Sequence, residues 1–151
     1  MGAAGEHVYE LARAIAHTAW LLRRHVAGRL AQKDSEWRLL AVLAEGAAVT
    51  RGEKPAQAEL SAMLGLSASA FTRLVDRAAA RGLVRRVAGR SRRAHAVRLT
   101  RKGRAAWRSI RRRIHVILPE VFDGVDGGQA RAALAVLQRV SRTLQGCKER
   151  R

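Results

Sequence analysis

Residues 57–104 read QAELSAMLGLSASAFTRLVDRAAARGLVRRVAGRSRRAHAVRLTRKGR, and this stretch decides the fold. Apolar residues recur at helical spacing in residues 57–64 and again in residues 68–81. Between these runs, Gly65 can take the left-handed conformation that ends a helix, and Ser67 can cap the amide groups of the next one. The pattern therefore predicts a helix, a turn and a second helix.

The second predicted helix, residues 68–81, has an outward face that is small, polar and cationic, as in a helix that enters a DNA major groove. Because a bidentate arginine–guanine contact discriminates between bases by about 1–3 kcal/mol, Arg73 is the expected base reader and Arg77 a secondary one. The serine and threonine hydroxyls are expected mainly on phosphates. The alternative is a solvated face without a function. The predicted contacts on this face are Ser67, Ser69, Thr72, Arg73 and Arg77.

A basic β-hairpin is predicted after Gly82, with strands at residues 83–87 and 95–99. A basic hairpin can reach a narrow minor groove, whose potential attracts guanidinium groups, although the alternative is a solvated run of charge. Asp76 is the only acidic residue near this surface, so we expect it to pair with a wing or neighbouring arginine and hold the surface in shape. The predicted minor-groove and phosphate contacts are Arg90, Arg92 and Arg93.

Helices are predicted on both sides of this stretch, at about residues 7–30, 34–46 and 100–124, and from residue 126 through Leu144. The first is too long for a domain of this size to cover, and the last carries a near-heptad apolar stripe, so both are expected to pack against a second subunit. The expected helix caps are Asp34, Pro55, Thr100 and the Asp126–Gln129 capping box, with Gly46 ending the second helix. The predicted inward faces comprise Trp37, Leu40, Ala41 and Ala44, then Leu60, Met63 and Leu64, then Phe71, Leu74, Val75 and Ala78.

The net charge of +18 is extreme and implies a polyanionic partner, either nucleic acid or an anionic membrane surface. The longest apolar run, residues 39–44, is far shorter than the ~20 residues of a spanning helix, and the start of the chain lacks the pattern of a leader. We therefore expect a cytoplasmic protein. No catalytic constellation or glycine-rich phosphate loop is present in the sequence, so no enzymatic activity and no cofactor are expected.

Cys147 is the single cysteine, and it lies near the end of the chain. It is expected to be an incidental thiol, with a peroxide-sensing role as the alternative. The five histidines could suggest a metal site. However, no two of them stand three or four residues apart on one helix, and no cysteine lies near them in the sequence. No metal site is therefore predicted.

The order of helix, turn, helix, basic hairpin and capped helix is that of a winged helix-turn-helix. The segments EWRLLAVLAE, LGLSASAFTRLVDRAAARGLVRR and RLTRKGR resemble the corresponding blocks of the MarR family of bacterial transcription regulators. The resemblance implies a mainly α fold, with a winged helix-turn-helix head of three helices and a two-stranded wing at residues 34–99. It also implies dimerisation helices at residues 1–33 and 100–151, joined with the head in one intertwined unit.

By the same resemblance, the protein would be a homodimer that binds a pseudo-palindromic operator in double-stranded DNA, and most members of this kind repress transcription. A crevice between the head and the dimerisation helices would bind a small aromatic or anionic effector. The residues predicted to surround that crevice are Trp20, Arg24, Trp37, Trp107 and Arg111, for which the alternative is that the tryptophans are simply core.

One departure from the family pattern falls at the wing tip. Where the family usually has an aspartate two residues before the minor-groove arginine, this chain has Ser91 before Arg93, on a tip that is about one residue shorter. The sequence therefore predicts a basic wing whose tip differs from the family pattern. Two other functions remain open from sequence: a non-specific architectural nucleic-acid-binding protein, and a thiol or metal sensor on the same fold.

Overall fold

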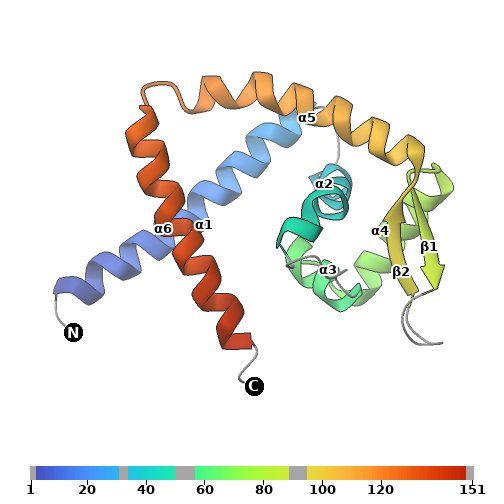
Figure 1. The fold of residues 1–151 in the computed structure, drawn as a ribbon, viewed down its shortest axis with the longest axis horizontal. Helices are drawn as coiled ribbons and strands as arrows, with labels where there is room; N and C mark the ends of the chain where they lie inside the picture. Colours follow the sequence, from blue (N-terminus) through green and yellow to red (C-terminus); the bar gives the residue numbers. More distant parts are fainter. Residues whose placement is uncertain (1–2, 31–33, 50–56, 89–94, 149–151) are drawn as a thin grey trace. The chain divides into compact units, whose positions relative to one another are not determined.

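The computed structural model describes residues 3–30, 34–49, 57–88 and 95–148, and it is mainly helical with one small sheet (Figure 1). The chain forms two compact units, Met1–Ile117 and Leu118–Arg151. The fold class is the predicted winged helix-turn-helix. The elements in order are α1 (Ala3–Leu30), α2 (Asp34–Val49), α3 (Gln57–Leu64), α4 (Ala68–Ala80), β1 (Val84–Ala88), β2 (His95–Leu99), α5 (Arg101–Val121) and α6 (Gly127–Lys148).

The turn between α3 and α4 forms as its residue types dictate. Gly65 has a φ of 65°, and the amide of Leu66 donates to the Ser61 carbonyl at 2.9 Å, which closes α3. Ser67 has an extended backbone, and its hydroxyl accepts from the Ala70 amide at 3.3 Å, which caps α4. Both predicted roles are confirmed, so the direction of α4 is fixed by local chemistry at each end of the turn.

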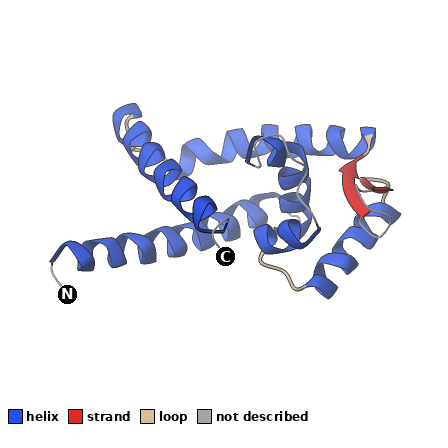
Figure 2. Ribbon diagram, turned by 60° about the horizontal axis from the view of Figure 1, so that its bottom comes forward, coloured by secondary structure: helices blue, strands red, loops and turns tan. Residues whose placement is uncertain are grey.

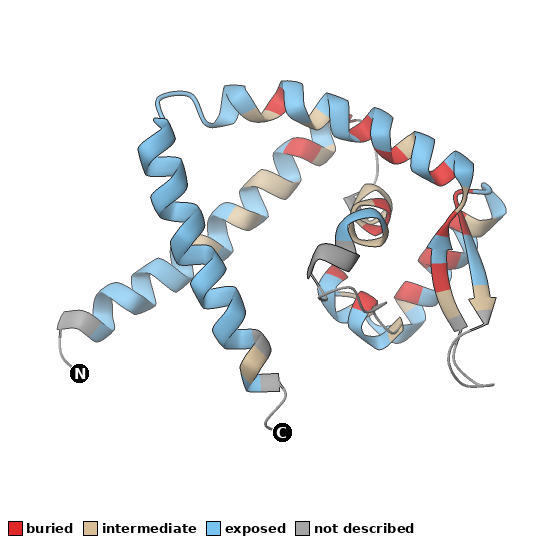
Figure 3. Ribbon diagram, in the orientation of Figure 1, coloured by how far each residue is buried: buried red, intermediate tan, exposed pale blue. Residues whose placement is uncertain are grey.

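The core of the first unit lies between α2, α3, α4 and the base of the hairpin (Figure 3). The four apolar residues predicted for α4 are all buried: Phe71, Leu74, Val75 and Ala78. Burying such side chains contributes roughly 1.5–3 kcal/mol each for the large ones. The outward face of α4 is therefore held in place by the packing of its inward face.

Three predictions about α2 and α3 are wrong in detail. Gly46 does not end α2, which continues to Val49, because the alanines that follow favour a helix enough to offset the roughly 1 kcal/mol that an interior glycine costs. Leu39 is fully buried while Ala44 is exposed, so the inward stripe is rotated by about one residue. Met63 is 36% exposed rather than buried, and the predicted cap Pro55 lies outside the described residues.

The two strands pair antiparallel, from Val84 opposite Leu99 to Ala88 opposite His95, in the hairpin that Figure 2 shows in red. Side chains alternate between faces, so Val84, Val97 and Leu99 are buried on the inner face while Arg85 and Arg98 lie opposite each other on the outer face. The predicted strand boundaries hold to within one residue. The hairpin tip, with Ser91, lies outside the described residues.

The hairpin passes directly into α5 through a close backbone contact. The Thr100 hydroxyl donates to the Gly82 carbonyl at 2.6 Å and accepts from the Gly103 amide at 3.0 Å, as predicted for a helix cap. Gly103 is buried, and a Cβ atom there would lie 1.9 Å from the Leu83 carbonyl oxygen. Only glycine allows the first turn of α5 to approach the start of the hairpin so closely.

The helix α6, in the second unit, begins with the predicted capping box. The Gln129 amide donates to the Asp126 carboxylate at 2.9 Å, and the Asp126 amide donates to the Gln129 side chain at 3.0 Å. The apolar stripe of this helix is exposed in the single chain and includes Leu134, Leu137, Val140 and Leu144. No described helix is both long and apolar enough to cross a bilayer.

Candidate nucleic-acid interface

The outward face of α4 presents the five residues that the sequence singled out: Ser67, Ser69, Thr72, Arg73 and Arg77. All are exposed, while Phe71, Leu74 and Val75, which lie between them along the helix, pack into the core. No described residue pairs with the guanidinium of Arg73 or of Arg77. Both cations therefore remain available to an external acceptor, such as a guanine edge or a phosphate.

The hydroxyls on this face differ in what they can still bond. The Ser67 and Ser69 hydroxyls lie 3.2 Å apart, so one donates to the other and one O–H remains for a phosphate oxygen. The Thr72 hydroxyl donates to the Ala68 carbonyl at 2.9 Å, which uses its only proton. Thr72 can therefore accept a hydrogen bond from a base amino group but cannot donate to a phosphate while this bond holds.

An ion pair joins α4 to the wing. The Arg86 guanidinium on β1 donates to the Asp76 carboxylate at 2.6 Å, which confirms the prediction that Asp76 pairs with a wing or neighbouring arginine. The two side chains are 40% and 60% exposed. An exposed pair of this kind contributes less than about 1 kcal/mol to stability, so its main effect is to orient the hairpin relative to α4.

Replacing Asp76 by asparagine should weaken operator binding by about threefold to tenfold while the unfolding midpoint stays within 2 °C, because the exposed pair orients the wing more than it stabilises the fold. Fluorescence anisotropy with labelled duplex, together with thermal unfolding, measures both quantities. Glu36→Gln is the matched control, since it removes the other ion pair of α4, between Arg81 and Glu36 at its far end. Unchanged DNA affinity in Asp76→Asn would contradict the orienting role.

The wing residues Arg90, Arg92 and Arg93 lie outside the described residues, and their predicted DNA contacts stay predictions. The described part of the hairpin carries further cations that the sequence analysis did not assign to DNA, at Arg85, Arg86 and Arg98. These residues point from the strands on alternate faces. By the strand register, Arg86 faces α4, whereas Arg85 and Arg98 lie on the opposite face of the hairpin.

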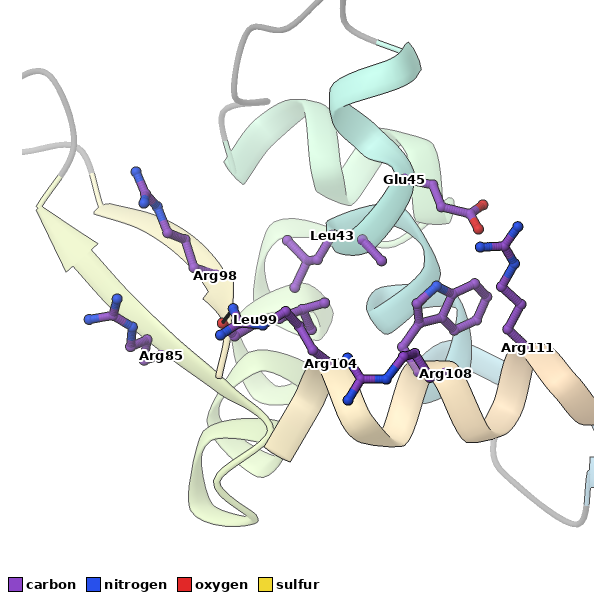
Figure 4. Close-up of a pocket in the computed structure, with 10 residues that line it drawn as sticks. Leu43, Glu45, Arg85, Arg98, Leu99, Arg104, Arg108 and Arg111 are labelled. Atoms are coloured by element: carbon purple, nitrogen blue, oxygen red, sulfur yellow. Dashed lines mark hydrogen bonds between the residues drawn. The ribbon is translucent and has the colours of Figure 1, made fainter. Parts of the chain in front are cut away.

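A pocket of about 510 Å³ lies between α2, the hairpin base and the start of α5 (Figure 4). Of the five residues predicted for an effector crevice, Trp107 and Arg111 line this pocket. The other lining residues are not among those five. The remaining lining comprises Leu43, Ala44, Glu45, Arg85, Arg98, Leu99, Arg104 and Arg108.

The other three predicted crevice residues lie elsewhere. Trp20 is 48% exposed on α1, with the Arg24 guanidinium 5.4 Å from its ring centre and the His17 ring stacked at 6.0 Å. Trp37 is half-buried at the start of α2, and its indole N–H is buried with no hydrogen-bond partner among the described residues. The structure thus does not gather the five residues at this pocket, and the effector site built from all five stays a prediction.

Metal and thiol chemistry find no support in the described residues. No group of three or more metal-ligating side chains comes together in the described ranges. Cys147 is exposed, and the predictions about its thiol chemistry stay predictions.

Residues 33–94 match the model of the MarR family. The solved structure of the transcriptional regulator PA3341 superposes with a TM-score of 0.73 at 26% identity, covering 90% of this chain and 98% of that one. A MarR family protein from Bacillus stearothermophilus gives 0.68 at 22% identity, covering 96% and 99%. CouR from Rhodococcus jostii RHA1, bound to p-coumaroyl-CoA, gives 0.67 at 21% identity, covering 87% and 91%. No curated protein matches the chain.

Proposed function

We propose that the chain is a repressor of the MarR family that binds a pseudo-palindromic operator as a homodimer, and the match of residues 33–94 to the family model and the shared fold support this. Its recognition helix is α4, and its wing lies in the adjacent minor groove. The observation that carries the proposal is the outward face of α4. It presents three hydroxyl residues and two arginines that no described residue pairs with, on a helix held in place by its buried face. We expect the protein in the cytoplasm, because a repressor must reach the DNA that it binds.

Exposed apolar side chains support the homodimer. In the single chain, α1 exposes Tyr9, Leu11, Trp20 and Leu21, and α6 exposes its own apolar stripe. Exposed apolar surface on this scale is typical of an interface. A two-fold arrangement places two recognition helices on successive major grooves, with half-site centres ~34 Å apart.

Footprinting on the region upstream of the protein's own gene tests the proposal. We expect two protected half-sites one helical turn apart, and light scattering should give two chains per particle. A monomer at micromolar concentration would contradict the dimer. Uniform protection that ignores sequence would instead favour the architectural alternative, which the +18 charge could also serve.

We also propose that a small effector controls DNA binding. CouR is bound to p-coumaroyl-CoA in its solved structure, and this chain shares its fold and has a pocket beside the wing. An effector can release DNA only if it binds one arrangement of the two heads more tightly than the other. The alternative signal is peroxide or zinc. It would be supported if either reagent releases the DNA and if replacing Cys147 or the histidines abolishes that release.

A further inference from the structure

We propose that the pocket between α2, the hairpin and α5, the arginine pocket, binds a small molecule that carries a phosphate group on an aromatic or similarly flat apolar body. The inference deepens the proposed effector response and rests on it, because it identifies the class of effector. Five arginines line this pocket against a single carboxylate. They are Arg85, Arg98, Arg104, Arg108 and Arg111, and the carboxylate is Glu45.

The arginines that line the pocket come from three elements. Arg85 and Arg98 project from neighbouring strands, while the other three follow one another along α5 at spacings of four and three residues, which places them on one face of the helix (Figure 4). The Arg104 side chain donates to the Leu99 carbonyl at 3.0 Å, which ties the helix to β2. No described residue pairs with the other four guanidinium groups.

The strand pair is unfavourable without an anion. Arg85 and Arg98 are directly opposite each other in the antiparallel ladder. Like charges at such positions repel and destabilise a hairpin. Glu45 points toward Arg111 at the far side of the pocket (Figure 4), and no described carboxylate pairs with Arg85 or Arg98. An anion placed between the strands and α5 would relieve this repulsion.

The charge and the lining define the class of ligand. A phosphate monoester carries about −1.5 to −2 charges near neutral pH and three oxygens that accept from guanidinium groups in pairs, so it matches several arginines better than a single carboxylate does. The pocket volume of about 510 Å³ suits a small molecule. Leu43, Leu99 and Trp107 provide apolar and aromatic surface for the body of the ligand.

Isothermal titration calorimetry of the full chain with phenyl phosphate tests the inference, with benzoate and inorganic phosphate as comparators. We expect phenyl phosphate to bind at least tenfold more tightly than either comparator, because benzoate has the ring with one charge and phosphate has the charge without a ring. Phenyl phosphate should also raise the thermal unfolding midpoint of the native protein. Equal affinity for benzoate, or no binding of phenyl phosphate at millimolar concentration, would overturn the proposal.

Variants locate the site. The double variant Arg98→Gln with Arg108→Gln should weaken phenyl phosphate binding at least tenfold. Arg101→Gln with Arg112→Gln removes the same charge from exposed positions of α5 outside the pocket and should change it less than twofold. Equal losses in both pairs would show general charge attraction and sink the idea. Arg85→Gln alone gives a second test if the double variant does not fold.

DNA binding is measured separately, without ligand, so that the two proposals can fail independently. If the protein binds phenyl phosphate in the pocket but protects no operator, this inference stands and the proposed repressor function is wrong. If the protein protects its operator but does not bind phenyl phosphate, only this inference is wrong. Operator footprinting of Arg108→Gln alone should match that of the native protein, because Arg108 lies on α5 and is not on the wing or among the proposed DNA contacts.

Discussion

Replacing Arg73 by alanine is expected to weaken operator binding about 5-fold to 150-fold, because a bidentate arginine–guanine contact is worth about 1–3 kcal/mol. Arg73 is exposed on α4 and no described residue pairs with it, so the fold should not change. Random-sequence duplex should lose no more than about threefold, since only a general cation is removed. Anisotropy titrations on the two duplexes measure the ratio.

The salt dependence of DNA binding distinguishes a base contact from a phosphate contact at Arg73. A phosphate contact lowers the slope of log affinity against log salt by about one, whereas a base contact leaves the slope nearly unchanged. Arg112→Ala is the matched control, because it removes the same exposed charge from α5. If Arg73→Ala loses equal affinity for both duplexes and flattens the slope, Arg73 is a phosphate contact and another residue reads the bases.

Replacing Gly103 by alanine is expected to destabilise the protein by about 3 kcal/mol or more, at the upper end of the cost of overpacking. The new Cβ would lie 1.9 Å from the Leu83 carbonyl oxygen, and this neighbour is backbone that cannot rotate away. The first turn of α5 would have to move from the hairpin, breaking the bond between the Thr100 amide and the same carbonyl. Chemical denaturation measures the loss.

Gly28→Ala is the matched control for this change. Gly28 lies inside α1, and a Cβ there would meet nothing within 4 Å, so alanine should stabilise the helix by roughly 0.5–1 kcal/mol in a single chain. If the two substitutions change the free energy of unfolding in opposite directions, the effect at Gly103 comes from the contact with Leu83. If Gly103→Ala is as stable as the native protein, the hairpin and α5 can separate without cost, and the close contact is not a structural requirement.

Much of the head could be predicted from sequence because its decisive features are local. The turn at Gly65 and Ser67, the cap at Thr100 and the capping box at Asp126 each depend on a few neighbouring residues, and each has the predicted geometry. The pairing of Asp76 was also predictable in kind, since this is the only acid beside a basic surface. Its partner, Arg86, could not be named before the strand register was known.

The part of the arginine pocket that the hairpin contributes was not predicted, for the same physical reason. Arg104, Arg108 and Arg111 carry a visible signal, because their spacing puts them on one helix face. Arg85 and Arg98 join them only through the pairing of the strands, and a shift of one residue would have turned both to the other face. The end of α2 shows the opposite failure, in which a glycine was taken as a stop although the alanines after it carried the helix on.

The outward apolar stripe of α6 also has a consequence for how much of the protein a cell must make. If a partner subunit covers this stripe, the stability of each chain depends on the concentration of the others, and the unfolding midpoint rises as the protein is concentrated. Gene dosage would then set both the occupancy of the operator and the survival of each chain. A mutant subunit with an intact α6 but no Arg73 would pair with native chains and silence them.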